Sequence, residues 1–342
     1  MNKSTIKERC GLKNTLYVAV PCYNEEEVLR ETAKRLKIKL EALMSEGKIS
    51  GGSRAVFIND GSKDSTWEII EELCAESGVF LGITLTGNRG HQNALLAGLM
   101  AVKDEADMVV SMDADLQDDI GAIDRMVDKY LEGCDIVYGV RSSREKDTFF
   151  KRLTAEGYYK VLGALGCKVV FNHADYRLLS ARALNALSLY GEQNLFLRGI
   201  VPMLGFKSAV VEYERGERFA GESKYPLKKM LAFASDGVVS LSLKPLRAAT
   251  TLGIIILFLA FAFLIFCIVG AILGHSMLNW KIIVFSVWAV GGLLLLAVGV
   301  LGEYVGRAYM EAKHRPRYFV ERSVGLKNGG GFSADSRGRG ND

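Results

Sequence analysis

Two aspartates stand at the end of an apolar run, at a spacing that suits a divalent cation. Asp113 and Asp115 follow MVVSM, a run with the length and composition of a buried strand. Side chains two residues apart on an extended chain point the same way, so both carboxylates can converge on one hard cation, Mg²⁺ or Mn²⁺, that bridges a diphosphate. Such a cation offsets charge on a leaving oxygen and removes the need for a protonated general acid. The alternative is a solvated turn that caps a helix near Asp118, which would be favoured if the two aspartates stood alone.

Two further polar segments follow the first two apolar runs. VPCYNEEE follows the first and INDGSKDST the second, at the strand ends where an α/β sheet binds ligands. Asp60 can accept hydrogen bonds from a uracil-like base or a ribose, and Gly61 lets the backbone approach a ligand closely. Alone, Asp60-Gly61-Ser62 is also a common turn with an N-cap. Together with the aspartate pair, three strand ends would line one crevice, which favours a ligand site.

Basic side chains are concentrated between residues 141 and 224. A diphosphate and a lipid phosphate both need cationic partners, and arginine pairs with phosphate oxygens in a bidentate manner. Solvated surface charge, or contact with anionic lipid, is the alternative for any single member. The members are Arg141, Arg144, Lys151, Arg152, Arg198, Arg215, Arg218 and Lys224.

The composition of the whole chain excludes several classes of function. A net charge of +4 over 342 residues is too small for a dedicated nucleic-acid binder, so no nucleic-acid partner is expected. The six cysteines lack the spacing of a zinc site or a disulfide framework. His91 and His173 stand alone, without the spacing of metal ligands, so ordinary hydrogen-bonded roles are expected for both.

An alternation of strands and helices must position these residues. From Thr15 to about Tyr138, five apolar runs of strand length alternate with longer segments suited to helices; the runs are YVAV, AVFI, LGITL, MVVSM and DIVY. Continuously apolar strands are covered on both faces, which predicts an α/β fold with a mainly parallel sheet and ligands at the strand carboxyl ends. Residues 141–225 are expected to complete this domain, which would span residues 1–225.

Two uncharged stretches, residues 248–279 and 282–302, follow this domain. About 20 apolar residues span the hydrocarbon layer, so we expect a hairpin of two transmembrane helices within residues 248–306, at about 250–273 and 282–304. Lysines and arginines flank the hairpin on both sides, whereas its joint holds only Lys281. The catalytic domain and both termini should therefore be cytoplasmic, on a multi-pass protein of the cytoplasmic membrane.

The segments on either side of the hairpin receive separate predictions. Residues 226–247 have helical periodicity beside lysines, which fits an amphipathic helix in the headgroup layer and equally a packed core helix. Residues 307–342 are expected to be a basic cytoplasmic tail whose Gly-rich end is disordered. The first 14 residues lack the apolar core of a secretory signal. Glu303 and Arg307 stand four apart and predict an ion pair where the second span ends.

Taken together, these motifs and segments closely resemble the family 2 glycosyltransferases of the polyprenyl-phosphate branch. This branch includes dolichyl-phosphate mannose synthases and bactoprenol glucosyltransferases. The resemblance covers most of the chain and rests on eight blocks in the family's order, followed by the two-helix anchor. The blocks are VPCYNEEE, INDGSKDST, TGNRGHQNALLAGL, MDADLQDD, RSSREKDTFFKRL, ADYRLLS, QNLFLRG and RFAGESKYPLKKML.

The resemblance implies a Rossmann-like GT-A domain and a role for particular residues. Asp113 and Asp115 would hold the metal, Gln117 would lie next to it, and Asp175 would be the carboxylate at the reaction centre. The nucleotide-binding residues would be Pro21, Tyr23, Asn24, Glu25, Asp60, Asn88, Arg89, Asp113 and Ala114. The lipid phosphate or diphosphate would be bound by Arg141, Arg218, Ser223 and Lys224.

Asp175 need not be a strong base for this chemistry. A phosphate monoester has its second pKa near 6, so the lipid phosphate is largely anionic at neutral pH and can attack without losing a proton to the enzyme. We expect Asp175 to position the donor sugar or support a basic neighbour, in a single displacement that inverts the anomeric centre. The alternative is that Asp175 only pairs with Arg177 or caps a turn.

The expected activity is metal-dependent transfer of a single hexose from a nucleotide-diphosphate sugar to undecaprenyl phosphate, for modification of cell-envelope glycans. UDP-glucose is the preferred donor; UDP-N-acetylglucosamine, a UDP-amino-arabinose or GDP-mannose would use the same framework. A processive synthase is disfavoured because QNLFLRG replaces the QxxRW block and one hairpin makes a poor channel. A silent nucleotide-sugar-binding subunit is disfavoured by the intact Asp-Ala-Asp. A homo-oligomer built through the anchors fits this organisation.

Overall fold

The computed structural model describes residues 14–142, 173–193, 195–214, 216, 244–273 and 280–326. These residues form two compact units. The first unit contains the described residues up to 216 together with residues 316–326, and the second contains residues 244–273 and 280–315. The predicted domain boundary at 225 and most of the predicted interfacial segment, residues 226–243, lie outside the described residues.

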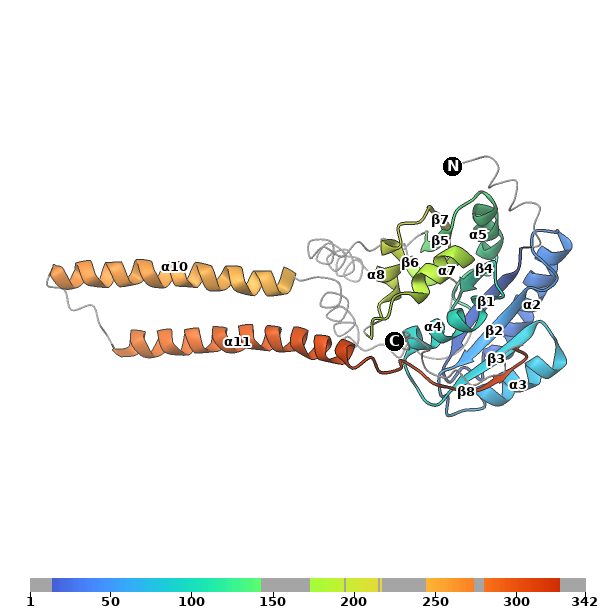
Figure 1. The fold of residues 1–342 in the computed structure, drawn as a ribbon, viewed down its shortest axis with the longest axis horizontal. Coiled ribbons are helices and arrows are strands. Elements are labelled where there is room, and N and C mark those ends of the chain that lie inside the picture. Colours follow the sequence, from blue (N-terminus) through green and yellow to red (C-terminus); the bar gives the residue numbers. More distant parts are fainter. Residues whose placement is uncertain are drawn as a thin grey trace, which may run out of the picture. The chain divides into compact units, whose positions relative to one another are not determined.

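An eight-stranded sheet forms the centre of the first unit, in the order β7-β5-β6-β4-β1-β2-β3-β8 (Figure 1). Its strands are β1 (Leu16–Cys22), β2 (Arg54–Asn59), β3 (Phe80–Leu85), β4 (Met108–Ser111), β5 (Ile136–Arg141), β6 (His173–Ser180), β7 (Ser208–Tyr213) and β8 (Val320–Val324). Only β6 and β8 run antiparallel to their neighbours. The predicted α/β fold with a mainly parallel sheet is confirmed, and the five predicted strands are β1 to β5.

Helices cover both faces of this sheet. On one face lie α2 (Leu29–Ser45), α3 (Thr66–Glu76) and α5 (Ala122–Leu131); on the other lie α4 (His91–Val102), α7 (Ala181–Ser188) and α8 (Leu197–Met203). Alternate residues of each strand point to opposite faces: Val18 and Val20 pack in the first core, whereas Tyr17 and Ala19 pack in the second. Burial on both faces explains why these strands are continuously apolar.

The chain returns to this sheet after residue 315. β8 pairs antiparallel with β3, and Ser323 is the register partner of Ile83. Arg317 donates to the carbonyl of Tyr190 at 2.6 Å, which fixes the segment before β8. The prediction of a tail from residue 307 is therefore wrong for residues 320–324. The adjacent charged residues Glu321 and Arg322 interrupt the apolar pattern of this strand, which a strand at the edge of a sheet tolerates.

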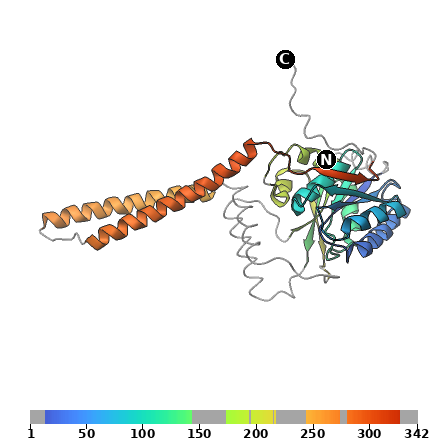
Figure 2. The same cartoon turned by 90° about the horizontal axis from the view of Figure 1, so that it is seen from below.

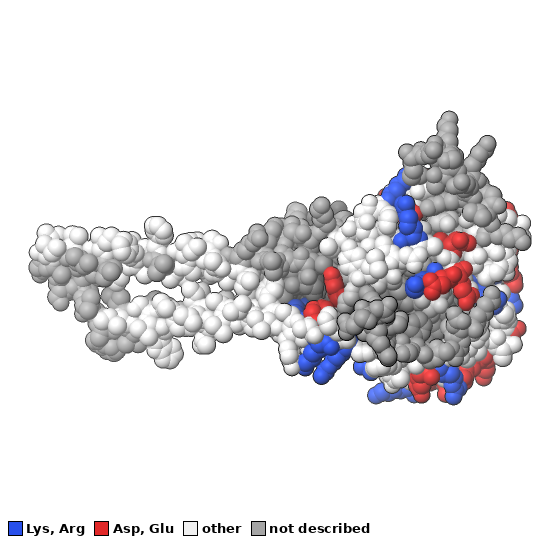
Figure 3. Space-filling view, viewed as in Figure 1, with Lys and Arg blue, Asp and Glu red and all other residues white. Residues whose placement is uncertain are grey.

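The second unit contains α10 (Lys244–Ile272) and α11 (Trp280–Ala312), which lie side by side (Figures 1 and 2). Their surface carries almost no charge along most of its length (Figure 3). Ser286–Ala312 is long and apolar enough to cross a membrane, and Ala249–Phe263 is a shorter apolar stretch. Arg307 pairs with Glu303 at 2.9 Å, as their spacing predicts. The described residues thus contain one candidate span, and the second predicted span stays a prediction.

Candidate active site

Three predicted ligand-binding segments meet at one edge of the sheet because β4, β1, β2 and β3 are consecutive parallel neighbours. The loops after β1 and β2 are joined by hydrogen bonds: Asn24 N–H donates to Oγ of Ser62 at 3.0 Å, and Lys63 N–H donates to Oδ1 of Asn24 at 2.9 Å. Asn24 adopts a positive φ of 55°, which asparagine tolerates better than most residues. Tyr23, next to Asn24, stays 41% exposed.

Asp60 is buried and holds the loop after β3. Its carboxylate accepts hydrogen bonds from the backbone N–H of Arg89 at 2.7 Å and of Gly90 at 2.9 Å. Burial raises its pKa, and these two bonds counteract the rise. The structure therefore gives Asp60 a local role that sequence reasoning did not foresee: it shapes the loop that carries Asn88 and Arg89, two predicted nucleotide contacts.

Gly61 makes the close approach of these two loops possible. It adopts φ +64°, and a Cβ there would lie 2.6 Å from the backbone N of Asn88 and from C of Gly87. Only glycine meets both demands without strain. The loops after β2 and β3 therefore depend on each other, and a side chain at position 61 would push them apart.

Asp113 and Asp115 follow β4 directly, and both are partly exposed. Oδ1 of Asp115 accepts a hydrogen bond from Gln117 N–H at 3.2 Å, and Thr32 of α2 donates to the carbonyl of Ala114 at 2.8 Å. Leu116 has φ 57°, a conformation that costs a non-glycine residue energy and that functional loops often contain. The loop is therefore held in a defined shape by contacts on both sides.

The donor set of this loop fits a hard divalent cation. Mg²⁺ and Mn²⁺ prefer oxygen ligands, and Mg²⁺ at a nucleotide is usually bound by one or two carboxylates, substrate phosphates and water. Asp113 and Asp115 would supply the two carboxylates. Among the residues that the structure describes, no group of three or more His, Cys, Asp or Glu side chains forms a complete protein cage for a metal. A cation shared with a diphosphate needs no such cage.

Asp175 lies on β6, buried between two arginines. Arg177 forms a short ion pair with it, and Arg198 of α8 donates to Oδ2 from Nη2 at 3.0 Å. Burial alone would raise the pKa of Asp175, but Arg198 and Arg177 hold it well below its usual range. This carboxylate stays ionised at neutral pH and is a poor proton acceptor. Asp175 therefore pairs with Arg177, which was the alternative role expected from the sequence, and it also pairs with a second basic residue, Arg198.

His91 lies between the carboxylates of Asp113 and Asp175. Its Nε2 is 3.5 Å from Oδ1 of Asp113 and 3.7 Å from Oδ2 of Asp175. Sequence reasoning gave this residue no part in the site, because no metal-ligand spacing surrounds it. The available signal was its place as the first residue of α4, directly after the third strand end of the sheet. The structure therefore adds His91 to the candidate active site.

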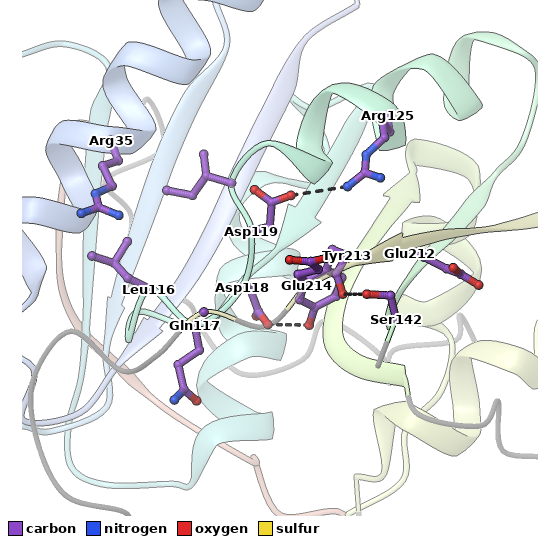
Figure 4. Close-up of a pocket in the computed structure, with 12 residues that line it drawn as sticks. Arg35, Leu116, Gln117, Asp118, Asp119, Arg125, Ser142, Glu212, Tyr213 and Glu214 are labelled. Carbon is purple, nitrogen blue, oxygen red and sulfur yellow. Dashed lines mark hydrogen bonds and ion pairs between the residues drawn. The ribbon is translucent and has the colours of Figure 1, made fainter. Parts of the chain in front are cut away.

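Asp118 and Tyr213 form a buried pair beside the Asp113 loop. Tyr213, the last residue of β7, donates its hydroxyl to Oδ1 of Asp118 at 2.5 Å. Burial, reinforced by Asp113, raises the pKa of Asp118 to about 6. Both residues line an open cavity of about 760 Å³ between α2, α5 and β7 (Figure 4). No sequence pattern indicated Tyr213, because only the β5–β7 pairing brings it here.

The structure places two of the eight predicted basic residues. Arg141 ends β5, and its Nε donates to the hydroxyl of Tyr213 at 3.4 Å. Arg198 contacts Asp175, as described above. The other residues predicted to bind phosphate lie outside the described residues; they are Arg144, Lys151, Arg152, Arg215, Arg218, Ser223 and Lys224. The side chain of His173 is not described either.

The chain is similar to known proteins over most of its length. Residues 17–188 match the family described as Glycosyl transferase family 2. An uncharacterized glycosyltransferase of Bacillus subtilis (strain 168), YkoT, is 49% identical over 306 residues, which are 90% of this chain and 91% of that protein. The prophage bactoprenol glucosyl transferase homolog of Escherichia coli (strain K12) is 37% identical over 89% of this chain and 98% of that protein. The bactoprenol glucosyl transferase of Shigella phage SfV is also 37% identical, over 89% and 97%.

Proposed function

Because the chain belongs to glycosyl transferase family 2, with the GT-A-like fold of that family, we propose that it transfers a single hexose from a nucleotide-diphosphate sugar to polyprenyl phosphate. UDP-glucose is the proposed donor and undecaprenyl phosphate the proposed acceptor. The observation that carries the proposal is that His91 lies between Asp113 and Asp175 where β4 and β6 pair, with Asp115 in the same loop as Asp113. Full-length similarity to proteins named bactoprenol glucosyl transferases supports the acceptor.

The donor would lie across the ends of β1, β2 and β4. Tyr23, Asn24, Glu25, Asn88 and Arg89 surround this edge and are proposed to contact the base and ribose, with Pro21, Asp60 and Ala114 holding the loops. Asp113 and Asp115, with Gln117 beside them, would hold Mg²⁺ or Mn²⁺ against the diphosphate. The bound cation would neutralise charge on the departing nucleoside diphosphate.

In the proposed reaction an oxygen of the lipid phosphate attacks the anomeric carbon. The bond from that carbon to the diphosphate oxygen breaks, and the nucleoside diphosphate leaves with the electron pair, so the configuration inverts. No proton needs to be removed from the acceptor, which agrees with the low pKa of Asp175. Asp175 instead holds Arg198 and Arg177 at the reaction centre, and those cations favour the anionic reactants.

The acceptor is proposed to reach the site from the cytoplasmic leaflet. Arg141, with Arg218, Ser223 and Lys224, would bind its phosphate, and α10 and α11 would span the membrane as a hairpin with both termini cytoplasmic. Their bare apolar surfaces and the lysines and arginines at their ends support this arrangement. Membrane lipid would surround the hairpin, and a second copy of the chain could pack against it.

A panel of nucleotide sugars tests the proposal. The detergent-purified full chain is incubated with undecaprenyl phosphate, Mn²⁺ and each of UDP-glucose, UDP-N-acetylglucosamine, a UDP-amino-arabinose and GDP-mannose, and nucleoside diphosphate release and lipid product are measured. We expect UDP-glucose to yield one hexose per lipid with inverted configuration. Retained configuration would contradict the single displacement, and long polymers would indicate a processive synthase. Donor binding without turnover for every sugar would indicate a silent binding subunit.

A further inference from the structure

One side of the Arg141 guanidinium group contacts two buried residues, Tyr213 and Asp118. Arg141 and Tyr213 are register partners at the carboxyl ends of the parallel strands β5 and β7. Nε of Arg141 donates to the Tyr213 hydroxyl at 3.4 Å, that hydroxyl donates to Oδ1 of Asp118 at 2.5 Å, and Nη2 of Arg141 lies 3.8 Å from the same oxygen. The Tyr213 hydroxyl therefore acts as acceptor toward the arginine and donor toward the aspartate, so its hydrogen-bonding capacity is used in both directions.

The tyrosine and aspartate are fixed, whereas the arginine is partly accessible. The side chain of Asp118 is 2% exposed and that of Arg141 is 29% exposed. Two bonds from Ser142, from its N–H at 2.9 Å and its hydroxyl at 3.1 Å, reach the carbonyl of Tyr213 and lock the strand ends together (Figure 4). The ring of Tyr213 packs edge-on against Tyr176, with centroids 5.2 Å apart. A rigid support thus lies beneath a long and otherwise flexible cation.

The charge balance of this group suits the binding of an anion. Burial alone would lower the pKa of Arg141, but Tyr213, Asp118 and Asp113 outweigh it, so the guanidinium stays charged. A guanidinium has five N–H donors, and the support engages only one edge of it, so the other edge can face phosphate oxygens.

We propose that Tyr213 and Asp118 are positioning residues for Arg141, which they hold in the orientation that binds the acceptor phosphate. The inference rests on the proposed function, which assigns Arg141 to that phosphate. Neither residue needs to touch a substrate. An arginine without this support would have to be ordered by the ligand itself, and the entropy of ordering it would weaken acceptor binding.

The structure supplies a matched control for the loss of the Tyr213 hydroxyl. Tyr176 belongs to the same aromatic pair, is equally buried, and donates its hydroxyl to the carbonyl of Asp119 at 2.8 Å. Tyr176→Phe therefore removes one hydroxyl hydrogen bond from the same layer without touching Arg141. A difference in acceptor binding between the two variants therefore reports on Arg141.

The test measures steady-state constants of the detergent-purified full chain with UDP-glucose and undecaprenyl phosphate. Tyr213→Phe should raise the acceptor KM about tenfold at unchanged donor KM, since one hydrogen bond to a charged group is lost. Asp118→Asn should also raise the acceptor KM. Tyr176→Phe should change it less than twofold. In an Arg141→Ala background, Tyr213→Phe should have no further effect on the acceptor KM.

Equal shifts in acceptor KM for the two tyrosine variants would overturn the positioning role, as would a full Tyr213→Phe effect in the Arg141→Ala background. An unchanged acceptor KM in Arg141→Ala itself would remove Arg141 from the acceptor site and the inference with it. Failure of the wild-type chain to glycosylate any polyprenyl phosphate would instead refute the proposed function. The three failures are therefore distinguishable in one set of assays.

Discussion

Asp175 is buried between two arginines, and its ionisation should be linked to stability. Its depressed pKa means that the folded state favours the charged form; the resulting stabilisation is complete above the unfolded pKa of about 3.9 and is lost as the pH falls through the folded value. Asp175→Asn leaves Arg177 buried without its ionic partner, and we expect a loss of about 3–5 kcal/mol at neutral pH. The difference in melting temperature between wild type and variant should be constant from pH 5 to 7 and shrink below pH 4. A difference that instead narrows near pH 6 would mean that Asp175 titrates there and serves as a base.

His91 should affect metal binding, because it lies 3.5 Å from the carboxylate of Asp113, which we propose holds the cation. Groups that orient a metal-binding carboxylate typically change metal affinity or activity by about 10–100-fold when removed. His91→Ala should therefore raise the Mn²⁺ concentration needed for half-maximal turnover by at least about tenfold. His91→Gln, which keeps an N–H donor, should lose less. Wild-type Mn²⁺ dependence in both variants would leave His91 without a role at this site.

The close approach of the loops after β2 and β3 should be needed for donor binding, and substitution of Gly61 tests this. Gly61→Ala places a Cβ 2.6 Å from the backbone of residues 87 and 88, in addition to the strain of φ +64°. Gly47 is a matched control, with φ +70° and no atom within 4 Å of the added Cβ. Gly47→Ala should cost about 1 kcal/mol of stability from backbone strain alone.

Gly61→Ala should cost more than this control and should also raise the donor KM, because it displaces the loop that carries Asn88 and Arg89. Thermal unfolding and donor titration measure the two effects. Equal stability losses in the two variants, with an unchanged donor KM in Gly61→Ala, would mean that the loop adapts without consequence.

Periodicity predicted β1 to β5 because each of these strands is buried on both faces and therefore reads as a continuous apolar run. It also placed Asp60, Asp113 and Asp115 correctly at the ends of those strands. β6, β7 and β8 were not predicted: the charged residues Asp175 and Arg177 interrupt the apolar pattern of β6, and exposed residues interrupt that of β7 and β8. His91 and Tyr213 were missed for a different reason: the contacts of His91 with Asp113 and Asp175, and of Tyr213 with Asp118, join segments far apart in sequence, which a single sequence does not reveal.

The return of the chain to the sheet links the two ends of the sequence. β8 covers the free edge of β3, Arg322 pairs with Glu71 at 2.6 Å, and Tyr318, Val320 and Leu326 pack against the core. A chain that ends at residue 315 should lose this edge strand and melt about 5 °C or more below wild type. A chain that ends at residue 326 keeps β8 and serves as the control. Indistinguishable melting temperatures and proteolysis rates for the two truncations would mean that β8 adds no stability to the sheet.

Transfer of labelled sugar by the Asp115→Ala variant tests whether the carboxylates after β4 hold a cation that the reaction needs. Wild type and variant are purified as full chains, and formation of hexosyl undecaprenyl phosphate from labelled UDP-glucose is followed across a Mn²⁺ titration and after EDTA treatment. We expect metal-dependent transfer by the wild type, abolished by EDTA and restored by Mn²⁺, and a loss of at least about 100-fold in the variant that Mn²⁺ does not restore. Equal turnover in both proteins would contradict this expectation, because the carboxylates after β4 would then have no part in the reaction.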